Sequence, residues 1–333
     1  MRCHVFPGQG VQKKGMGSGL FPRFAALCSQ ADEVLGYSIE ELCLTNPERR
    51  LSTTEYAQPA IYVVNALHHL AAREELPPAD YFAGHSLGEY SALFAAGAFD
   101  FATGLALVKR RAELMGQADG GAMAAVVGAP EAIVEQTLRE HGADGVVIAN
   151  YNAPEQFVLA GSAEELTRLK PAFEALEGVR GFVPMRVSGA FHSPWMAPAA
   201  ADFRTFLASV PVAELTTPVI SNVTGGPFEA GAEAVREALV EQLTQPVRWM
   251  DCVLYLRHAG VTTFVELGGS KVLTSLIDKI PAPATPSEPT PWREYRDERV
   301  LTLLQKCASG EQSVDRTIEL IRVGMPAAMG GRR

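Results

Sequence analysis

The sequence predicts an α/β protein that carries a smaller unit inserted into a larger one, and three observations support this prediction. Short apolar strands at residues 4–6 and 81–83 each run into a glycine-containing loop. After each loop, apolar residues recur at the spacing of a helix. Residues 122–188 instead follow the order β-α-β-β-α-β, which is typical of a ferredoxin-like unit. The chain has 333 residues, more than one compact core usually holds.

The spacing of apolar residues gives the elements in order. In the first part we expect a strand at 4–6, helices at 20–34 and 59–73, a strand at 81–83, a helix starting after Ser86 and a helix at 103–116. The inserted unit should contain strands at 122–128, 146–150, 157–161 and 181–188, with helices at 130–140 and 163–176. A helix at 191–207 and strands at 218–223 and 264–267 complete the larger part.

These elements define the expected domains. Residues 1–121 and 189–280 should form the large α/β domain, and residues 122–188 the ferredoxin-like subdomain. Residues 281–333 are expected to be a linker and a C-terminal tail, because 281–292 hold five prolines in twelve residues. Two short helices are expected in this tail, at 298–306 and 314–323.

Composition excludes several classes of function. Hydrophobic residues make up 47% of the chain and charged residues 20%, which is ordinary for a globular protein. The net charge of −9 disfavours sequence-independent nucleic-acid binding, which needs a basic surface. The five cysteines are odd in number and form no CxxC pair, so neither a disulfide framework nor a cysteine-rich zinc site is expected. No secretory signal or membrane-spanning stretch is recognisable, and a cytoplasmic location is the expectation.

The strongest local motif is Gly84-His85-Ser86-Leu87-Gly88, a G-x-S-x-G between a predicted strand and a predicted helix. Flanking glycines permit the sharp turn that exposes a serine hydroxyl, and the helix start leaves free N–H groups beside it. This arrangement suits acyl transfer through a nucleophilic Ser86. A chance match, in which the serine only caps the helix, is the alternative.

A serine nucleophile needs a base, and the chain has seven histidines. Most of them fall on helices or among charged residues, where a structural role is more common. His85 adjoins the nucleophile, but neighbouring side chains on such a turn usually point apart. His192 follows the inserted unit, at the junction of a loop and a helix, so we expect it to be the base.

The N-terminal loop Phe6-Pro7-Gly8-Gln9-Gly10 is glycine-lined, and it fits neither a dinucleotide fingerprint nor a P-loop. It can still present the N–H of Gln9 to a substrate oxygen. Taken together, this loop, Gln58-Pro59-Ala60, Gly84–Glu89 and Ala190-Phe191-His192-Ser193 resemble malonyl-CoA:acyl carrier protein transacylases. Ile220–Thr224, Gln245–Trp249 and Glu266-Leu267-Gly268 fit the same family, and the resemblance covers roughly residues 1–280.

The resemblance implies an α/β-hydrolase-like large domain and a role for each matching position. Ser86 matches the nucleophile and His192 the general base. The family holds this histidine by a backbone carbonyl, which the resemblance assigns here to Gln245. Gln9 and Leu87 match the residues whose N–H groups form the oxyanion hole, and Gln58 matches a glutamine in the acyl pocket.

Arg111 matches the arginine that binds the malonyl carboxylate, and a planar guanidinium suits this task because it can form two parallel hydrogen bonds. Its neighbours Lys109 and Arg110 make a charged, solvent-facing helix surface the alternative interpretation. Phe191 matches a position where phenylalanine accompanies malonyl rather than methylmalonyl selection, since a large ring would crowd a branched α-carbon. Phe191 could equally be a core residue.

The sequence therefore predicts an acyltransferase that moves malonyl from malonyl-CoA to the phosphopantetheine thiol of an acyl carrier protein, through a malonyl-serine. Within the family, the motifs look most similar to free-standing enzymes that serve polyketide synthases. No metal or other cofactor is expected, and a monomer is the family-level expectation. The alternatives are an editing hydrolase of the same fold, a transferase of fatty acid synthesis, a catalytically inactive docking subunit and a general esterase.

Overall fold

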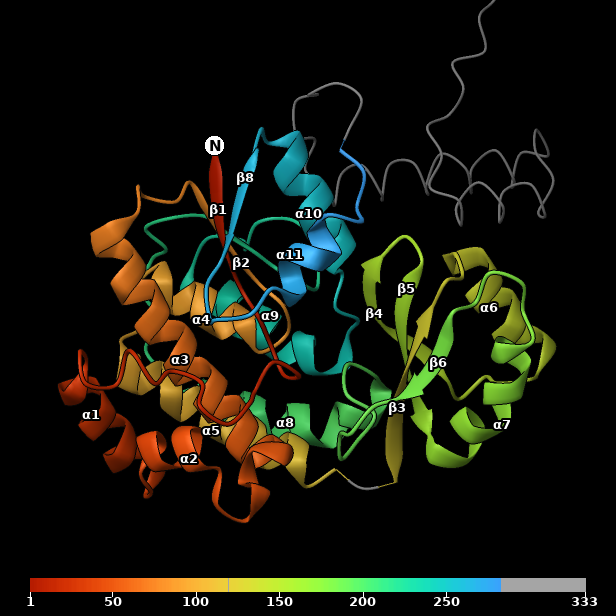
Figure 1. Cartoon of the computed structure of the whole chain (residues 1–333), viewed down its shortest axis with the longest axis horizontal. Coiled ribbons are helices and arrows are strands. Elements are labelled where there is room, and N and C mark those ends of the chain that lie inside the picture. Colours follow the sequence, from red (N-terminus) through yellow and green to blue (C-terminus); the bar gives the residue numbers. More distant parts are fainter. Residues whose placement is uncertain (119, 283–333) are drawn as a thin grey trace, which may run out of the picture.

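The computed structural model describes residues 1–118 and 120–282 and contains two separate sheets (Figure 1). The predicted tail from residue 283 onward, with its two expected helices, lies outside the described residues. Within the described part, no helix is both long and apolar enough to cross a membrane.

The first sheet is parallel, with strand order β7-β2-β1-β8. Its strands are short, as the sequence predicted: β1 (Arg2–Phe6), β2 (Tyr81–Gly84), β7 (Val219–Ile220) and β8 (Thr263–Glu266). The helices around it are α1 (Ala25–Leu35), α2 (Ile39–Thr45), α3 (Thr54–Glu75), α4 (Gly88–Ala95), α5 (Phe101–Gly116), α8 (Ala197–Leu207), α9 (Ala232–Thr244), α10 (Trp249–His258) and α11 (Val272–Ile277), with the 3-10 turns η1 (Pro47–Ser52) and η2 (Pro194–Met196).

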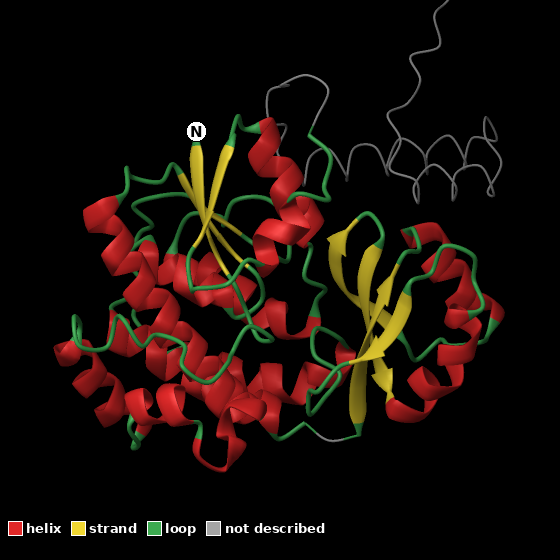
Figure 2. Cartoon of the chain, in the orientation of Figure 1, coloured by secondary structure: helices red, strands yellow, loops and turns green. Residues whose placement is uncertain are grey.

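Alternation along β1 explains how helices cover both faces of this sheet. Phe6 points into the core shared with α3, α4 and α5, whereas Val5 points to the other face, where α10 and α11 pack. Helix α3 is buried along most of its length, which fits its position between the sheet and the outer helices (Figure 2). The carboxyl ends of β1 and β2 therefore open at one edge of a sheet that is covered on both sides.

The second sheet is antiparallel, with strand order β4-β5-β3-β6. It is built from β3 (Gly121–Val127), β4 (Val147–Ala153), β5 (Gln156–Ser162) and β6 (Gly181–Pro184), and α6 (Glu131–Glu140) and α7 (Ala163–Glu174) pack on one face. This is the predicted β-α-β-β-α-β order, with the strand order of a ferredoxin-like unit. The fold prediction is confirmed, while the domain limits at 121/122 and 188/189 stay predictions.

Several boundaries differ from the sequence prediction. Strand β4 continues to Ala153 rather than ending at residue 150, and β6 ends at Pro184 rather than at residue 188. The helix expected from residue 191 begins at Ala197, after η2, because His192 has a left-handed φ of 57° and Pro194 starts a new turn. Helices α2, α9, α10 and α11 were not predicted.

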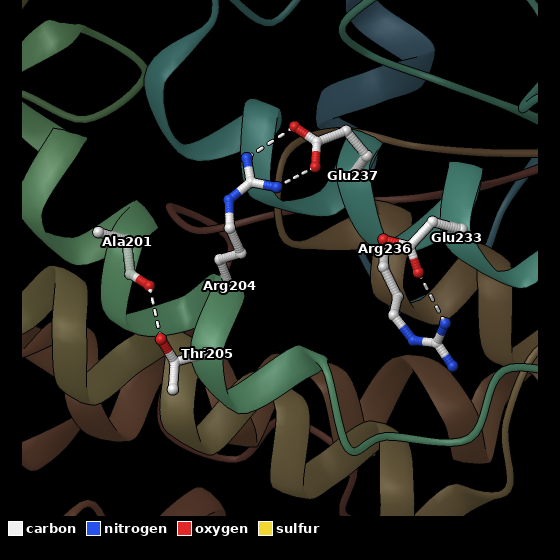
Figure 3. A network of polar contacts seen from close by, with 6 residues as sticks. All are labelled: Ala201, Arg204, Thr205, Glu233, Arg236 and Glu237. Atoms are coloured by element: carbon white, nitrogen blue, oxygen red, sulfur yellow. Dashed lines mark hydrogen bonds and ion pairs between the residues drawn. The ribbon is translucent and has the colours of Figure 1, made fainter.

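Helices α8 and α9 pack against each other, and the side chains along their exposed edge are paired (Figure 3). Arg204 of α8 faces Glu237 of α9 with two guanidinium nitrogens, one at 2.6 Å from Oε1. Arg236 pairs with Glu233 one turn earlier on its own helix, at 3.1 Å. Exposed pairs of this kind are worth about 0–1 kcal/mol each, so the buried apolar contacts hold the two helices together.

Candidate active site

The segment from Gly84 to Gly88 forms a sharp strand-to-helix turn at the end of β2. Ser86 sits at its tip with a left-handed φ of 52°, a conformation that costs a side-chain-bearing residue energy and persists only when the surroundings impose it. The flanking glycines are required by close backbone approach: a Cβ on Gly84 would lie 1.9 Å from the Gly88 carbonyl carbon, and one on Gly88 would lie 1.9 Å from Phe6 O. The predicted turn is confirmed.

Asn222, just after β7, holds this turn from below. Its Oδ1 accepts a hydrogen bond from the Ser86 N–H at 2.6 Å, and its Nδ2 donates to Gly84 O at 2.7 Å. Asn222 is fully buried, so these bonds satisfy an amide that would otherwise be costly to bury. No role was predicted for Asn222 beyond its place in a family motif.

His192 lies against the serine. Its Nε2 is 2.7 Å from Ser86 Oγ, and only 4% of the residue is exposed. Burial lowers the pKa of His192 to about 3, and the positive charge of Arg111 adds to this effect. The imidazole is thus neutral at pH 7, which is the state that a general base requires. The structure brings His192, and not His85, to Ser86, and the role of His192 as the base stays a prediction; His85 Nε2 instead lies 2.7 Å from Asn152 Oδ1 on β4.

The carbonyl that holds His192 is not the predicted one. His192 Nδ1 makes its hydrogen bond to Gln242 O at 2.8 Å, three residues before Gln245. Gln242 lies in the last turn of α9, where carbonyls have no partner within the helix, so its oxygen is free to accept from the imidazole. Gln245 follows the helix. Its backbone also raises the pKa of His192, but by less than the backbone of Gln242 does. The Gln242 bond places the proton on Nδ1 and leaves Nε2 to accept from Ser86.

Arg111 is a fully buried side chain at the base of the site, not part of a solvent-facing surface. Its Nη1 donates to Gln58 Oε1 at 2.7 Å, and its Nη2 donates to Gln242 Oε1 at 3.0 Å and to Ser86 Oγ at 3.1 Å. Burial lowers the pKa of Arg111 from its ordinary value. Of the three basic residues at 109–111, only Arg111 reaches the serine: Lys109 bonds to Val34 O and Arg110 pairs with Glu113.

The N-terminal loop closes over the turn. An ideal Cβ at Gly8 would lie 3.5 Å from the N atom of Leu87, so the backbone leading to Gln9 approaches that of Leu87. Among the hydrogen bonds of the described residues, none uses the N–H of Gln9 or of Leu87. Two unused backbone donors beside a serine are what an oxyanion hole needs. The Gln9 side chain contacts Thr54 at 3.2 Å and Gln58 at 3.4 Å.

A cleft of about 710 Å³ leads to the serine, with loops and helices of the large part on one side and the antiparallel sheet on the other. Ser86, Arg111 and Gln58 line it from the large part of the chain, and residues of β3, β4, β5 and β6 line the other side. Phe191 borders the cleft beside His192 and is 5% exposed, so it is a core residue and also a wall of the site. Within residues 1–118 and 120–282, no three His, Cys, Asp or Glu side chains are placed to share a metal ion.

Two residues that complete the polar network had no predicted role. Gln242 contributes both its carbonyl and its side-chain amide, and Glu89 is a carboxyl that is 1% exposed on the first turn of α4. Glu89 ends the family motif Gly84–Glu89. A glutamic acid in an otherwise uncharged helix was the sequence feature that could have indicated its role. Nothing in the sequence favours Gln242 over the nearby Gln245 as the residue that holds His192, because both precede the same Pro-Val-Arg-Trp segment.

Comparison with known proteins agrees with this geometry. The model of the acyl transferase domain family matches residues 3–288. The polyketide biosynthesis malonyl CoA-acyl carrier protein transacylase BaeC of Bacillus velezensis is 49% identical over 282 residues, which cover 84% of this chain and 96% of BaeC. A solved malonyl CoA-acyl carrier protein transacylase from Burkholderia pseudomallei has a TM-score of 0.81 at 48% identity, over 84% of this chain and 97% of that one.

A second solved structure holds a type II polyketide synthase acyl-carrier protein in complex with its malonyl-transacylase. That transacylase has a TM-score of 0.79 at 36% identity, and the match covers 84% of this chain and 92% of that one. The resemblance predicted from the motifs is confirmed.

Proposed function

Because the chain belongs to the acyl transferase domain family, we propose that it transfers a malonyl group from malonyl-CoA to the phosphopantetheine thiol of an acyl carrier protein in polyketide biosynthesis. The observation that carries the proposal is the contact of a neutral, carbonyl-held His192 and a buried Arg111 with the same Ser86 hydroxyl. The names of BaeC and of the complexed transacylase support the malonyl group, the carrier protein and the pathway.

The first half-reaction loads the serine. Arg111 binds the free carboxylate of malonyl-CoA while Ser86 Oγ attacks the thioester carbon and His192 Nε2 takes the hydroxyl proton. The N–H groups of Gln9 and Leu87 stabilise the oxyanion. The C–S bond then breaks, His192 returns the proton to the departing CoA sulfur, and malonyl-Ser86 remains.

The second half-reaction reverses this chemistry with a different thiol. The phosphopantetheine thiol gives its proton to His192 and attacks the ester carbonyl, and the released Ser86 oxygen takes the proton back. No redox step occurs, and every proton passes through His192.

The charges explain why binding and proton transfer cooperate. The Arg111 charge helps to lower the pKa of His192. A bound malonyl carboxylate offsets that charge, so the imidazole becomes more basic when the reacting serine must be deprotonated. A substrate without a carboxylate gives no such gain. This difference argues against an editing hydrolase, whose acyl substrates lack the second acid group.

Intact-protein mass spectrometry after mixing with malonyl-CoA tests the proposal. We expect a malonyl adduct on the wild type and none on Ser86→Ala. No adduct, together with Ser86-dependent hydrolysis of acyl-carrier thioesters, would favour the editing hydrolase.

We further propose that the enzyme acts as a monomer in the cytoplasm, and the four cysteines of the described part, all free, support a reducing compartment.

A further inference from the structure

Glu89 is a buried acid that the reaction as described leaves without a task. It lies three residues after Ser86, and its own N–H donates to Ser86 O at 3.1 Å. Its carboxyl Oε1 accepts from the Asn222 N–H at 2.8 Å, and its Oε2 accepts from Gln242 Nε2. A buried carboxyl with a donor on each oxygen is a defined hydrogen-bonding group, and burial raises its pKa to about 8.

The Gln242 side-chain amide lies between a hydrogen-bond acceptor, Glu89, and a hydrogen-bond donor, Arg111. Its Nε2 donates to Glu89 and, at 3.0 Å, to Ser86 O, while its Oε1 accepts from Arg111 Nη2 at 3.0 Å. An amide flipped by 180° would turn its oxygen to the carboxyl and its NH₂ to the guanidinium, which can only donate. The acceptors Glu89 Oε2 and Ser86 O, together with the donor Arg111, therefore hold the amide in the orientation that serves Arg111.

The same residue also holds the base. The Gln242 carbonyl accepts from His192 Nδ1, so one residue contacts Arg111 by its side chain and His192 by its main chain. Gln242 is fully buried in the last turn of α9, and its carbonyl accepts from His192, while the preceding carbonyl, that of Glu241, accepts from the Gln245 N–H. An anchor on its amide limits how this turn can move.

We propose that Glu89 is a positioning residue that, by accepting from the Gln242 amide, keeps the carboxylate-binding Arg111 and the proton-transferring His192 in register with Ser86. The proposal rests on the proposed function, since it assigns Glu89 a task in that reaction. It differs from a purely structural role in one respect: the effect passes through the donor–acceptor polarity of a single side-chain pair.

Exchanging the acid and the amide between positions 89 and 242 tests this proposal. In Glu89→Gln, the Gln oxygen can accept from Asn222, but its NH₂ then faces the Gln242 NH₂. Gln242 must flip or lose the contact, and Arg111 loses an acceptor. In the double variant Glu89→Gln/Gln242→Glu, the Gln NH₂ meets a carboxylate oxygen, and the other carboxylate oxygen faces Arg111. The donor to Ser86 O is lost in this variant, so the recovery should be partial.

The experiment measures single-turnover malonylation of Ser86 over a range of malonyl-CoA concentrations, with the wild type, both single variants and the double variant. We expect the ratio of maximal rate to half-saturating concentration to fall about 100-fold in Glu89→Gln, with both constants affected. A displacement of the reacting groups by about 1 Å costs that much. We expect the double variant to recover at least about tenfold over Glu89→Gln. Circular dichroism and thermal midpoints report whether each variant is folded.

The outcomes separate the claims. Loading of the wild type at Ser86 tests the proposed function, and the variants test the role of Glu89. A Glu89→Gln enzyme within about twofold of the wild type would overturn the positioning role. So would a folded double variant no faster than Glu89→Gln, or a Glu89→Gln variant that fails to fold, because either result would make Glu89 a structural residue.

Discussion

Replacing Arg111 with lysine should change which acyl group the enzyme accepts. Lysine keeps the positive charge, but it cannot present two parallel N–H groups to a carboxylate, and it leaves at least one of the buried Gln58 and Gln242 oxygens without its donor. A hydrogen bond to a charged group is worth about 1.5–3 kcal/mol. The loss of one such bond at the substrate predicts a fall of roughly 10- to 150-fold in kcat/KM for malonyl-CoA.

The assay compares Ser86 acylation by malonyl-CoA and by acetyl-CoA, which lacks the carboxylate. We expect the acetyl rate to fall as well, because Arg111 also contacts Ser86 Oγ, but to fall at least about tenfold less than the malonyl rate, since a substrate without a carboxylate makes no use of the fork. The ratio of the two rates isolates the carboxylate contact from general damage to the site. An equal loss with both substrates would refute the assignment of Arg111, and so would an unchanged malonyl rate.

Three further predictions concern the turn, the base and the surface. Gly88→Ala should destabilise the protein by several kcal/mol or prevent folding, because its Cβ would lie 1.9 Å from Phe6 O; a normal urea midpoint would contradict the close approach. At malonyl-CoA concentrations far below half-saturation, where the rate reports the free enzyme, malonylation should stay level from pH 7.5 to pH 5. Burial and the Arg111 charge lower the pKa of His192 to about 3, so the base stays neutral over this range; a rate that halves near pH 6.5 would contradict this. Arg204→Ala should cost less than about 1 kcal/mol of unfolding free energy by urea titration, because its pair with Glu237 is exposed, and a loss above 2 kcal/mol would show that this pair holds α8 on α9.

The parts of the site that follow local rules could be predicted from the sequence. Ser86 lies in a motif whose glycines dictate a turn, and the structure gives both glycines contacts that exclude a side chain. The ferredoxin-like order was readable because strands and helices of the inserted unit have distinct periods. His192 was chosen for its place at a loop-to-helix junction and Arg111 by the family resemblance, and the structure brings both to Ser86.

The errors fall where tertiary contacts decide the outcome. The base-holding carbonyl was placed at Gln245 because motif order cannot say which carbonyl at a helix end points inward; the geometry of the last turn of α9 selects Gln242. The helix after His192 starts later than expected because a left-handed His192 and Pro194 interrupt it, and only the position of the imidazole against Ser86 explains that conformation. The network through Glu89 and Asn222 joins segments more than 130 residues apart, and no local pattern contains it.

The central claim is that malonyl-Ser86 is an intermediate whose acyl group passes to a carrier thiol rather than to water. The most direct measurement isolates the malonylated enzyme, freed of CoA, and divides it between buffer and buffer containing a phosphopantetheinylated carrier protein, with both proteins followed by intact mass. We expect the adduct to persist in buffer alone and to move to the carrier within the mixing period, leaving unmodified enzyme. Equal loss of the adduct in both samples, with free malonate and an unmodified carrier, would contradict it.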